Sequence, residues 1–189
     1  MPLAADGYGL LPVVEVSPEA LAGFDCGKPH LNEFLVNAPN FHRDRLGLTS
    51  VVFHRDLAGR VIGYFTLAND SLPLTTSEQG ELGLHDTVVL KAYPAVKLGR
   101  LAVASDLQGQ GIGEQVMDLV HGEILDSASL SAARLVILDA DNEPRVVRFY
   151  RKLGYQESLW AEKKAIKVSG SKPVAAPPST IKMIRDILA

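Results

Sequence analysis

The stretch that decides the fold is LGRLAVASDLQGQGIG, residues 98–113. An apolar run ends at Ala104, glycines alternate at positions 109, 111 and 113, and an amphipathic helix is predicted from about Ile112 to Asp126. Glycine takes positive φ or approaches a ligand closely at little cost. The first turn of a helix has unpartnered N–H groups and a dipole that favours an anion. The stretch therefore predicts a strand, a phosphate-binding loop and a helix; a glycine-rich turn without a ligand is the alternative.

Two better-known phosphate loops do not fit this spacing. A P-loop needs G-x-x-x-x-G-K-[ST], and no Lys-Ser or Lys-Thr follows these glycines. The dinucleotide fingerprint needs G-x-G-x-x-G, whereas the glycines here are spaced G-x-G-x-G. The pattern therefore excludes both of these nucleotide-binding motifs.

Periodicity and punctuation predict a mixed α/β (α+β) chain. Strands are predicted at 49–54, 61–68, 96–104, 134–140, 155–160 and 181–188, and helices at 31–38, 112–126 and 144–153. The first helix is expected to end before Pro39, and residues 56–60 are expected to connect a hairpin. Residues 1–12 are expected to form a loose arm, 70–95 an irregular segment with at most a short helix, and 162–179 a long loop.

Length and composition indicate one globular domain over residues 1–189. Hydrophobic residues make up 47% and charged residues 22% of the chain, with a net charge of -3. No apolar run reaches the length of a membrane span, no signal sequence is visible, and the single cysteine cannot form an internal disulfide. The five histidines lack metal-ligand spacing. We therefore expect a cytoplasmic protein without a metal or a membrane partner.

Two motifs in order resemble those of the GNAT N-acetyltransferase superfamily, over about residues 15–188. The sequence QGQGIG (108–113), which follows RLAV (100–103), is similar to motif A, Q/R-x-x-G-x-G/A; FYRKLGY (149–155) is similar to motif B. This resemblance implies a mostly antiparallel mixed sheet with splayed central parallel strands and flanking helices. It also implies a homodimer, by the family's habit of pairing strand edges.

The resemblance implies acetyl-CoA as the cosubstrate. The backbone of Leu101, Ala102 and Val103 would bind the pantetheine arm, and the pyrophosphate would be held by Gln108, Gly109, Gln110, Gly111, Ile112 and Gly113. The family often places a cofactor-binding asparagine seven residues before the motif-B tyrosine. That position is Glu143 here, so the candidate Asn142 is displaced by one residue.

Tyr150 is the candidate general acid for the departing thiolate. Its phenol, with a pKa of about 10, is protonated at neutral pH. Its helical spacing with Val146, Phe149 and Leu153 also fits a core residue, but the family's tyrosine faces the thioester sulfur. No general base is identified; the candidates for a water-mediated relay are Asp139, Asp141 and Glu143, and more weakly His85.

The sequence leaves three functions open, of which two differ in the amine acceptor. With no carboxylate on 96–104, an amine of lowered pKa is favoured, and Cys26 has no visible base partner that would make it a nucleophile. A small-molecule or peptide amine ranks first. The opening FDCGKPHLNEFL (24–35) resembles that of GNAT toxins that acetylate aminoacyl-tRNA, and this function ranks second. It would bring tRNA and an antitoxin as partners, with residues 145–152 in contact with RNA phosphates. A non-catalytic acyl-CoA-binding module is third. The basic run from Arg145 to Lys167 also fits an ordinary solvated surface.

Overall fold

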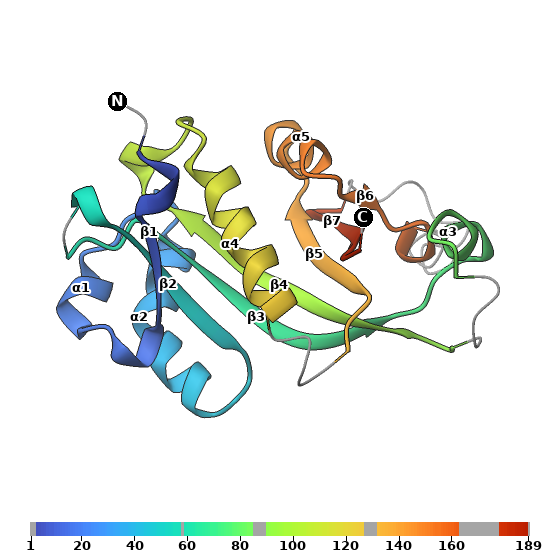
Figure 1. Cartoon of the computed structure of the whole chain (residues 1–189), viewed down its shortest axis with the longest axis horizontal. Helices are drawn as coiled ribbons and strands as arrows, with labels where there is room; N and C mark the ends of the chain where they lie inside the picture. Colours follow the sequence, from blue (N-terminus) through green and yellow to red (C-terminus); the bar gives the residue numbers. More distant parts are fainter. Residues whose placement is uncertain (1–2, 58, 85–89, 127–131, 163–177, 189) are drawn as a thin grey trace. The chain divides into compact units, whose positions relative to one another are not determined.

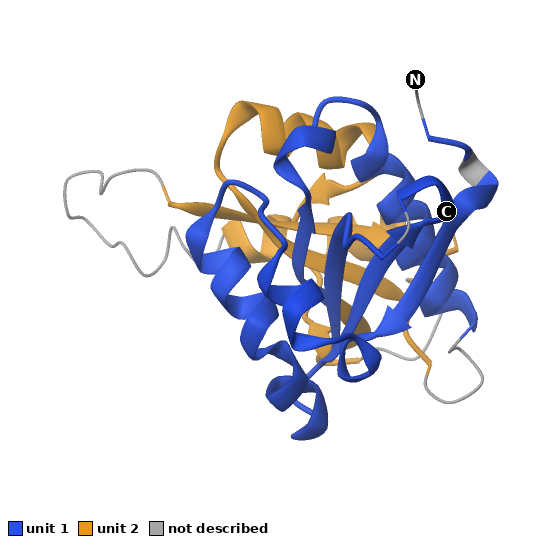
Figure 2. Cartoon of the chain, turned by 90° about the vertical axis from the view of Figure 1, so that its left-hand side faces the viewer, with its two compact units in different colours: residues 1–68, 98–127 blue, residues 69–97, 128–189 orange. Residues whose placement is uncertain are grey.

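The computed structural model describes residues 3–57, 59–84, 90–126, 132–162 and 178–188. The chain divides into two compact units, each described by itself below (Figure 2). Unit 1 comprises residues 1–68 and 98–127, and unit 2 comprises residues 69–97 and 128–189.

The described residues form a seven-stranded, mostly antiparallel sheet with one parallel pair, in the order β1-β2-β3-β4-β5-β7-β6 (Figure 1). The strands are β1 (Tyr8–Pro12), β2 (Leu48–His54), β3 (Gly63–Leu72), β4 (Tyr93–Val103), β5 (Leu135–Asp141), β6 (Gln156–Glu157) and β7 (Thr180–Asp186). The α-helices are α1 (Pro18–Ala22), α2 (Pro29–Arg43), α3 (Thr76–Glu81), α4 (Ile112–Asp126) and α5 (Pro144–Lys152). The mixed α/β class expected from the sequence is confirmed, and α4 has the predicted bounds.

The expectation of a loose arm at residues 1–12 is wrong, because residues 8–12 form strand β1. This strand pairs antiparallel with β2, from Tyr8 opposite His54 to Pro12 opposite Ser50. The buried ring of His54 also binds the carbonyl oxygen of Ala4 through Nε2 at 2.9 Å. A Cβ on Gly7 would lie 2.4 Å from that nitrogen, so only glycine fits there. A partner about 45 residues away therefore orders a segment that is too short to show periodicity.

Helix α2 does not end before Pro39 as expected but continues to Arg43. A proline within a helix removes one backbone hydrogen bond and normally ends or kinks it. Here Leu35 and Ala38 are fully buried, and Phe34 packs edge-to-face on Phe41 at 5.6 Å between ring centroids. Packing on both sides of the proline offsets the lost hydrogen bond.

In unit 2, the expected strand 155–160 is wrong except at Gln156–Glu157, and residues 159–162 are helical. The hydroxyl of Ser158 accepts from the N–H of Ala161 at 3.3 Å, which is the geometry of a helix cap. The N–H of Leu159 donates to the carboxylate of the buried Glu78 at 2.8 Å. Glu78 also closes the capping box of α3 with Thr75.

The remaining connections of unit 2 agree largely with expectation. The irregular segment 70–95 contains helix α3 and the ends of β3 and β4, and the last strand is β7. The core of this unit is apolar, and its buried members are Leu72, Leu74, Leu84, Tyr93, Ala95, Leu135, Ile137 and Ile184. Of the long loop expected at 162–179, residues 163–177 lie outside the described part of the chain.

Candidate functional site

The glycine loop, residues 108–113, joins the end of β4 to α4 in unit 1, after a short 3₁₀ turn at Ser105–Leu107. Gly109 and Gly111 have φ angles of 76° and 83°, in the left-handed region that disfavours every side chain with a Cβ. A Cβ at either position would meet nothing within 4 Å. Backbone conformation, not crowding, therefore requires these two glycines.

The backbone of the glycine loop offers a group of hydrogen-bond donors. The N–H groups of Glu114 and Gln115 both donate to the carbonyl of Gly111, at 3.1 and 3.4 Å. None of the described residues accepts a hydrogen bond from the N–H groups of residues 109–113. Free N–H groups before and within the first turn of a 15-residue helix are a favourable environment for an anion.

The side chain of Gln108 binds the protein itself. Its amide donates to the carbonyl of Val103 at 2.9 Å and to the carbonyl of Cys26 at 3.0 Å. Its backbone N–H donates to Ser105 at 3.4 Å. Gln108 therefore fixes the position of the glycine loop.

The opening 24–27 is built into the same region. The N–H of Ser105 donates to the carbonyl of Asp25 at 2.9 Å, next to the Cys26 carbonyl that Gln108 binds. The carboxylate of Asp25 accepts from the N–H of Gly27 at 2.8 Å and from the amide of Asn32 at 2.7 Å. These two hydrogen bonds lower the pKa of Asp25. The sequence of this segment does not predict its contact with the glycine loop.

The thiol of Cys26 is buried and donates to Asn32 Oδ1 at 3.1 Å, and the Cys26 N–H donates to the same oxygen at 3.0 Å. The described residues place no basic side chain at this sulfur, whose other contact is the carbonyl oxygen of Lys28 at 3.8 Å. Cys26 is thus a structural residue of the loop.

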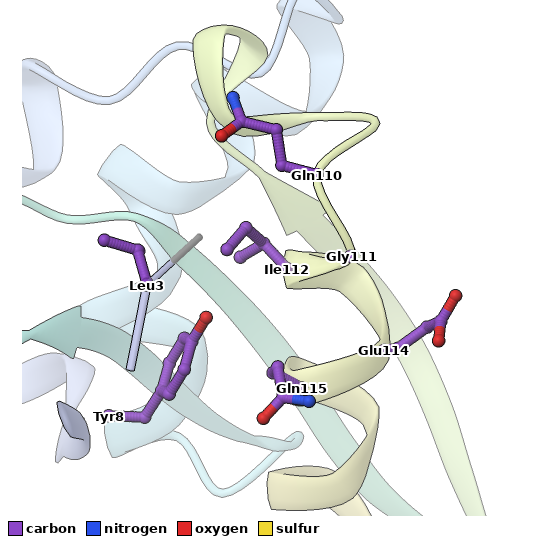
Figure 3. Close-up of a pocket in the computed structure, with 7 residues that line it drawn as sticks. All are labelled: Leu3, Tyr8, Gln110, Gly111, Ile112, Glu114 and Gln115. Atoms are coloured by element: carbon purple, nitrogen blue, oxygen red, sulfur yellow. The ribbon is translucent and has the colours of Figure 1, made fainter. Parts of the chain in front are cut away.

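A small cavity of about 190 Å³ lies on the flank of α4 beside the glycine loop (Figure 3). Tyr8 of β1 faces Ile112 and Gln115 of α4 across it, and Gly111 forms part of its wall. The Tyr8 hydroxyl is buried without a partner among the described residues, and burial raises its pKa.

The segment Leu101–Val103 ends β4 and packs tightly on β3. A Cβ on Gly63 would lie 2.8 Å from the carbonyl oxygen of Ala102, so β3 reaches this distance only because residue 63 has no side chain. The N–H of Ala104 donates to the carbonyl of Ile62 at 2.9 Å. The backbone that precedes the glycine loop is therefore held in place from one side.

Tyr150 lies on α5 in unit 2 with only 8% of its surface exposed. Its ring packs edge-on against Phe149 and Tyr155, at 5.0 and 5.7 Å between centroids. Burial, and secondarily the charge of Asp141, raises the pKa of Tyr150 to about 12. No described residue hydrogen-bonds to its hydroxyl. The side chain thus combines the core packing that its spacing indicated with a firmly held proton.

Asn142 directs its side chain to the approach of β7. Its amide donates to the carbonyl of Pro178 at 2.9 Å, and its backbone N–H donates to that of Ser179 at 2.9 Å. Glu143 is the N-cap residue of α5 but makes no side-chain cap. Asn142 therefore links two segments of unit 2, which is a structural role that its sequence position did not indicate.

Asp139, a candidate for the proton relay, is held between two lysines of unit 2. Its carboxylate oxygens lie 2.7 Å from the Nζ atoms of Lys97 and Lys182. Burial raises the pKa of Asp139, but the hydrogen bonds and charges of Lys182 and Lys97 outweigh this and lower it. A carboxylate of lowered pKa that is bound by two cations is a poor base. His85 lies outside the described residues.

Comparison with known proteins identifies the class. A family model described as an acetyltransferase (GNAT) domain matches residues 49–157. A solved structure described as a bacterial toxin is similar over 100% of this chain and 93% of its own, with 19% identity and a TM-score of 0.72. A complex of AtaT with acetyl-methionyl-tRNAfMet is similar over 93% of both chains, with 20% identity and a TM-score of 0.68.

A third similar structure is a mutant of the AtaT toxin bound to acetyl-CoA and to the C-terminus of the antitoxin AtaR. It is 20% identical, covers 97% of this chain and 95% of its own, and has a TM-score of 0.64. The chain belongs to the GNAT acetyltransferase family and is an N-acetyltransferase. The resemblance drawn from the two motifs is thereby confirmed.

Within the described ranges, no three potential ligands from His, Cys, Asp and Glu gather as a metal site. The same ranges contain no helix with the length and hydropathy needed to traverse a bilayer.

Proposed function

We propose that the protein transfers the acetyl group of acetyl-CoA directly to the α-amine of aminoacyl-tRNA. The observation that carries the cofactor assignment is the row of N–H groups at residues 109–113, which have no acceptor in the described part of the chain and suit a pyrophosphate. The backbone of Leu101–Val103 would bind the pantetheine arm. The contacts of Gln108 with Val103 and Cys26 support this arrangement, because they hold the donors in place before a ligand arrives.

In the proposed reaction the amine nitrogen attacks the thioester carbonyl, and the C–S bond breaks as the C–N bond forms. Tyr150 donates its proton to the departing sulfur, the ammonium product loses a proton to water, and solvent restores the phenol. Because burial raises the pKa of Tyr150 to about 12, its phenol is protonated throughout the physiological range and has a proton to donate. Direct transfer agrees with the buried, hydrogen-bonded state of Cys26.

Two features of unit 2 support an α-amine on RNA as the acceptor. Asp139 is engaged by two lysines, and an α-amine, with a pKa of about 8, needs less help from a base than a lysine does. Arg145 and Arg148 are exposed on α5 and have no acidic partner among the described residues. Arg145 lies in the first helical turn, where the dipole disfavours a cation, so a phosphate ligand would account for it.

The structural relatives support the same acceptor, since AtaT is described with acetyl-methionyl-tRNAfMet and with the antitoxin AtaR. By analogy we propose a cytoplasmic toxin that is held by an antitoxin, with a homodimer as the assembly. The second candidate is a small-molecule or peptide amine, favoured by the overall net charge of -3, which does not attract RNA. A non-catalytic acyl-CoA-binding module is the third.

The test is transfer of labelled acetyl groups to aminoacyl-tRNA, amino acids, peptides and simple amines. Turnover confined to aminoacyl-tRNA supports the proposal, whereas turnover of free amines alone favours the second candidate. Binding of CoA without turnover of any acceptor favours the third. Tyr93→Phe is the matched control for Tyr150→Phe, because the Tyr93 hydroxyl is buried in the core of unit 2 and no described residue hydrogen-bonds to it.

A further inference from the structure

Arg100 is a half-buried residue of β4 in unit 1 that precedes the segment Leu101–Val103. Its guanidinium carbon lies 3.8 Å from the centroid of the Phe34 ring on α2. The other aromatic neighbours of Phe34 are Tyr64, stacked at 6.1 Å between ring centroids, and Phe41, edge-on at 5.6 Å. This aromatic support fixes the plane of the guanidinium and leaves its edge for hydrogen bonds.

Arg100 has no acidic partner among the described residues. Other arginines of the chain are paired with carboxylates: Arg55 with Asp6, Arg60 with Asp106, Arg134 with Asp186, and Arg151 with Glu157. Arg55 and Arg151 in these pairs are more exposed than Arg100, so water already stabilises their charges. A half-buried cation without a counter-charge is costly unless a ligand supplies one.

If the cofactor binds as proposed, the position of Arg100 along β4 places this residue near the reacting end of the cofactor. The glycine loop lies at the C-terminal end of β4, so the phosphates would lie there. The pantetheine arm would then run back along the strand from Val103 to Leu101. The acetyl group would arrive near Arg100, and the phosphates of CoA would lie at the far end of the arm.

We propose that Arg100 binds an oxyanion, a phosphate or a carboxylate, that the amine acceptor carries. This inference rests on the proposed function and names the feature by which the acceptor is selected. A guanidinium edge offers two parallel N–H donors, which match the oxygens of either group. In aminoacyl-tRNA the oxyanion is the phosphate of the terminal nucleotide; in a free amino acid or peptide it is the carboxylate.

The experiment uses two pairs of acceptors that differ in this charge, and each rate is expressed per neutral amine. One pair is an amide-linked aminoacyl-adenosine with and without its 5′-phosphate, and the other is an amino acid and its amide. Each is tested with the wild type, Arg100→Gln, Arg100→Lys and the control Arg43→Gln, an exposed arginine of α2 that contacts Asn40. Thermal unfolding of each variant separates lost folding from lost recognition.

We expect the wild type to favour the charged member of one pair by about 10- to 100-fold in kcat/KM, the size of one charge-assisted hydrogen-bonded contact. Arg100→Gln should remove this preference through the acceptor KM, leave the KM for acetyl-CoA unchanged, and be partly rescued by Arg100→Lys. The pair that responds identifies the source of the oxyanion. No preference in either pair, an unchanged preference in Arg100→Gln, or a raised KM for acetyl-CoA instead would overturn the inference.

Failure of the proposed function is distinguished by calorimetric titration of the same acceptors into protein saturated with CoA. Charge-dependent binding that Arg100→Gln abolishes supports the inference even where aminoacyl-tRNA is not acetylated. Equal affinity for the charged and uncharged members of both pairs, or no measurable affinity for any of them, overturns it. Turnover of aminoacyl-tRNA that is indifferent to Arg100 keeps the proposed function and removes only this inference.

Discussion

The side-chain amide of Gln108 donates to the carbonyl oxygen of Cys26, 82 residues earlier in the chain, at 3.0 Å. The same amide donates to Val103 at 2.9 Å, so one side chain connects the strand end, the opening 24–27 and the glycine loop. Two carbonyl oxygens accept from one amide, which a carboxylate cannot replace because it has no donor at neutral pH.

Replacement of Gln108 should therefore weaken CoA binding without removing a cofactor contact. We expect Gln108→Ala to lower the free energy of unfolding by about 1–2 kcal/mol, and Gln108→Glu to lower it further, since its charge would face two carbonyl oxygens. Gln110→Ala is the control, because its amide reaches only the Asp106 carbonyl, at 2.8 Å on the exposed side. Chemical denaturation and calorimetry with CoA measure both effects; equal stability of Gln108→Ala and Gln108→Glu would contradict the explanation.

Alanine at Gly111 and at Gly122 should change stability in opposite directions. Neither Cβ would meet an atom within 4 Å, but Gly111 has a φ of 83° whereas Gly122 lies within α4. We expect Gly111→Ala to destabilise the fold by about 1–2 kcal/mol through left-handed strain. Gly122→Ala should stabilise it by about 0.5–1 kcal/mol through helix propensity. Thermal unfolding measures both, and only Gly111→Ala should weaken CoA binding.

Tyr150→Phe should reduce kcat by about 100-fold or more while the affinity for CoA changes little. Because burial raises the pKa of Tyr150 to about 12, its protonated form is fully present at every pH below about 11. The wild-type kcat/KM should rise as the acceptor amine loses its proton and then stay level to pH 10. The wild-type kcat/KM could instead fall between pH 8 and 10 while that of Tyr150→Phe does not. This result would assign Tyr150 a much lower pKa than its burial implies.

Asp139→Asn should affect stability more than catalysis, since Lys97 and Lys182 occupy the carboxylate. About a third of this side chain is exposed, so solvent screening limits the expected loss to about 1 kcal/mol at pH 7. A lowered pKa stabilises the folded state above the unfolded pKa of about 4, and this stability is lost as the pH falls through the lower folded value. The difference in unfolding free energy between wild type and Asp139→Asn should therefore shrink below pH 4. A 100-fold loss of rate at pH 7 would instead restore Asp139 as a base.

The parts of the fold that could be predicted are those whose signals are local. Helix α4 follows a glycine pattern and an apolar face, and α5 lies between Pro144 and Gly154, so both were placed almost to the residue. Strand β1 depends on a partner distant in the sequence, His54. The continuation of α2 through Pro39 likewise depends on the residues that pack against the faces of this helix. The helix and strand propensities of a segment's own residues do not indicate such a partner.

The candidate site divides in the same way. The glycine loop has positive φ at Gly109 and Gly111, as a phosphate-binding loop requires, and the spacing of these glycines indicated it. The assignment of Gln108 to its side-chain partners and the engagement of Asp139 by two lysines were not predictable, because they arise where separate strands and loops meet. That Arg100 has no acidic partner among the described residues likewise becomes visible only in the folded chain.

Gly63 has a consequence for any genetic selection of inactive variants. The 2.8 Å between its would-be Cβ and the Ala102 carbonyl oxygen means that even alanine must displace β3 or β4. Under the proposed function, survivors of a toxicity screen should thus include substitutions at position 63, whose Cβ would meet Ala102 and Val116. Such variants should accumulate as folded protein with a misplaced strand, and a sequence-based search for catalytic positions would miss the cause of their inactivity.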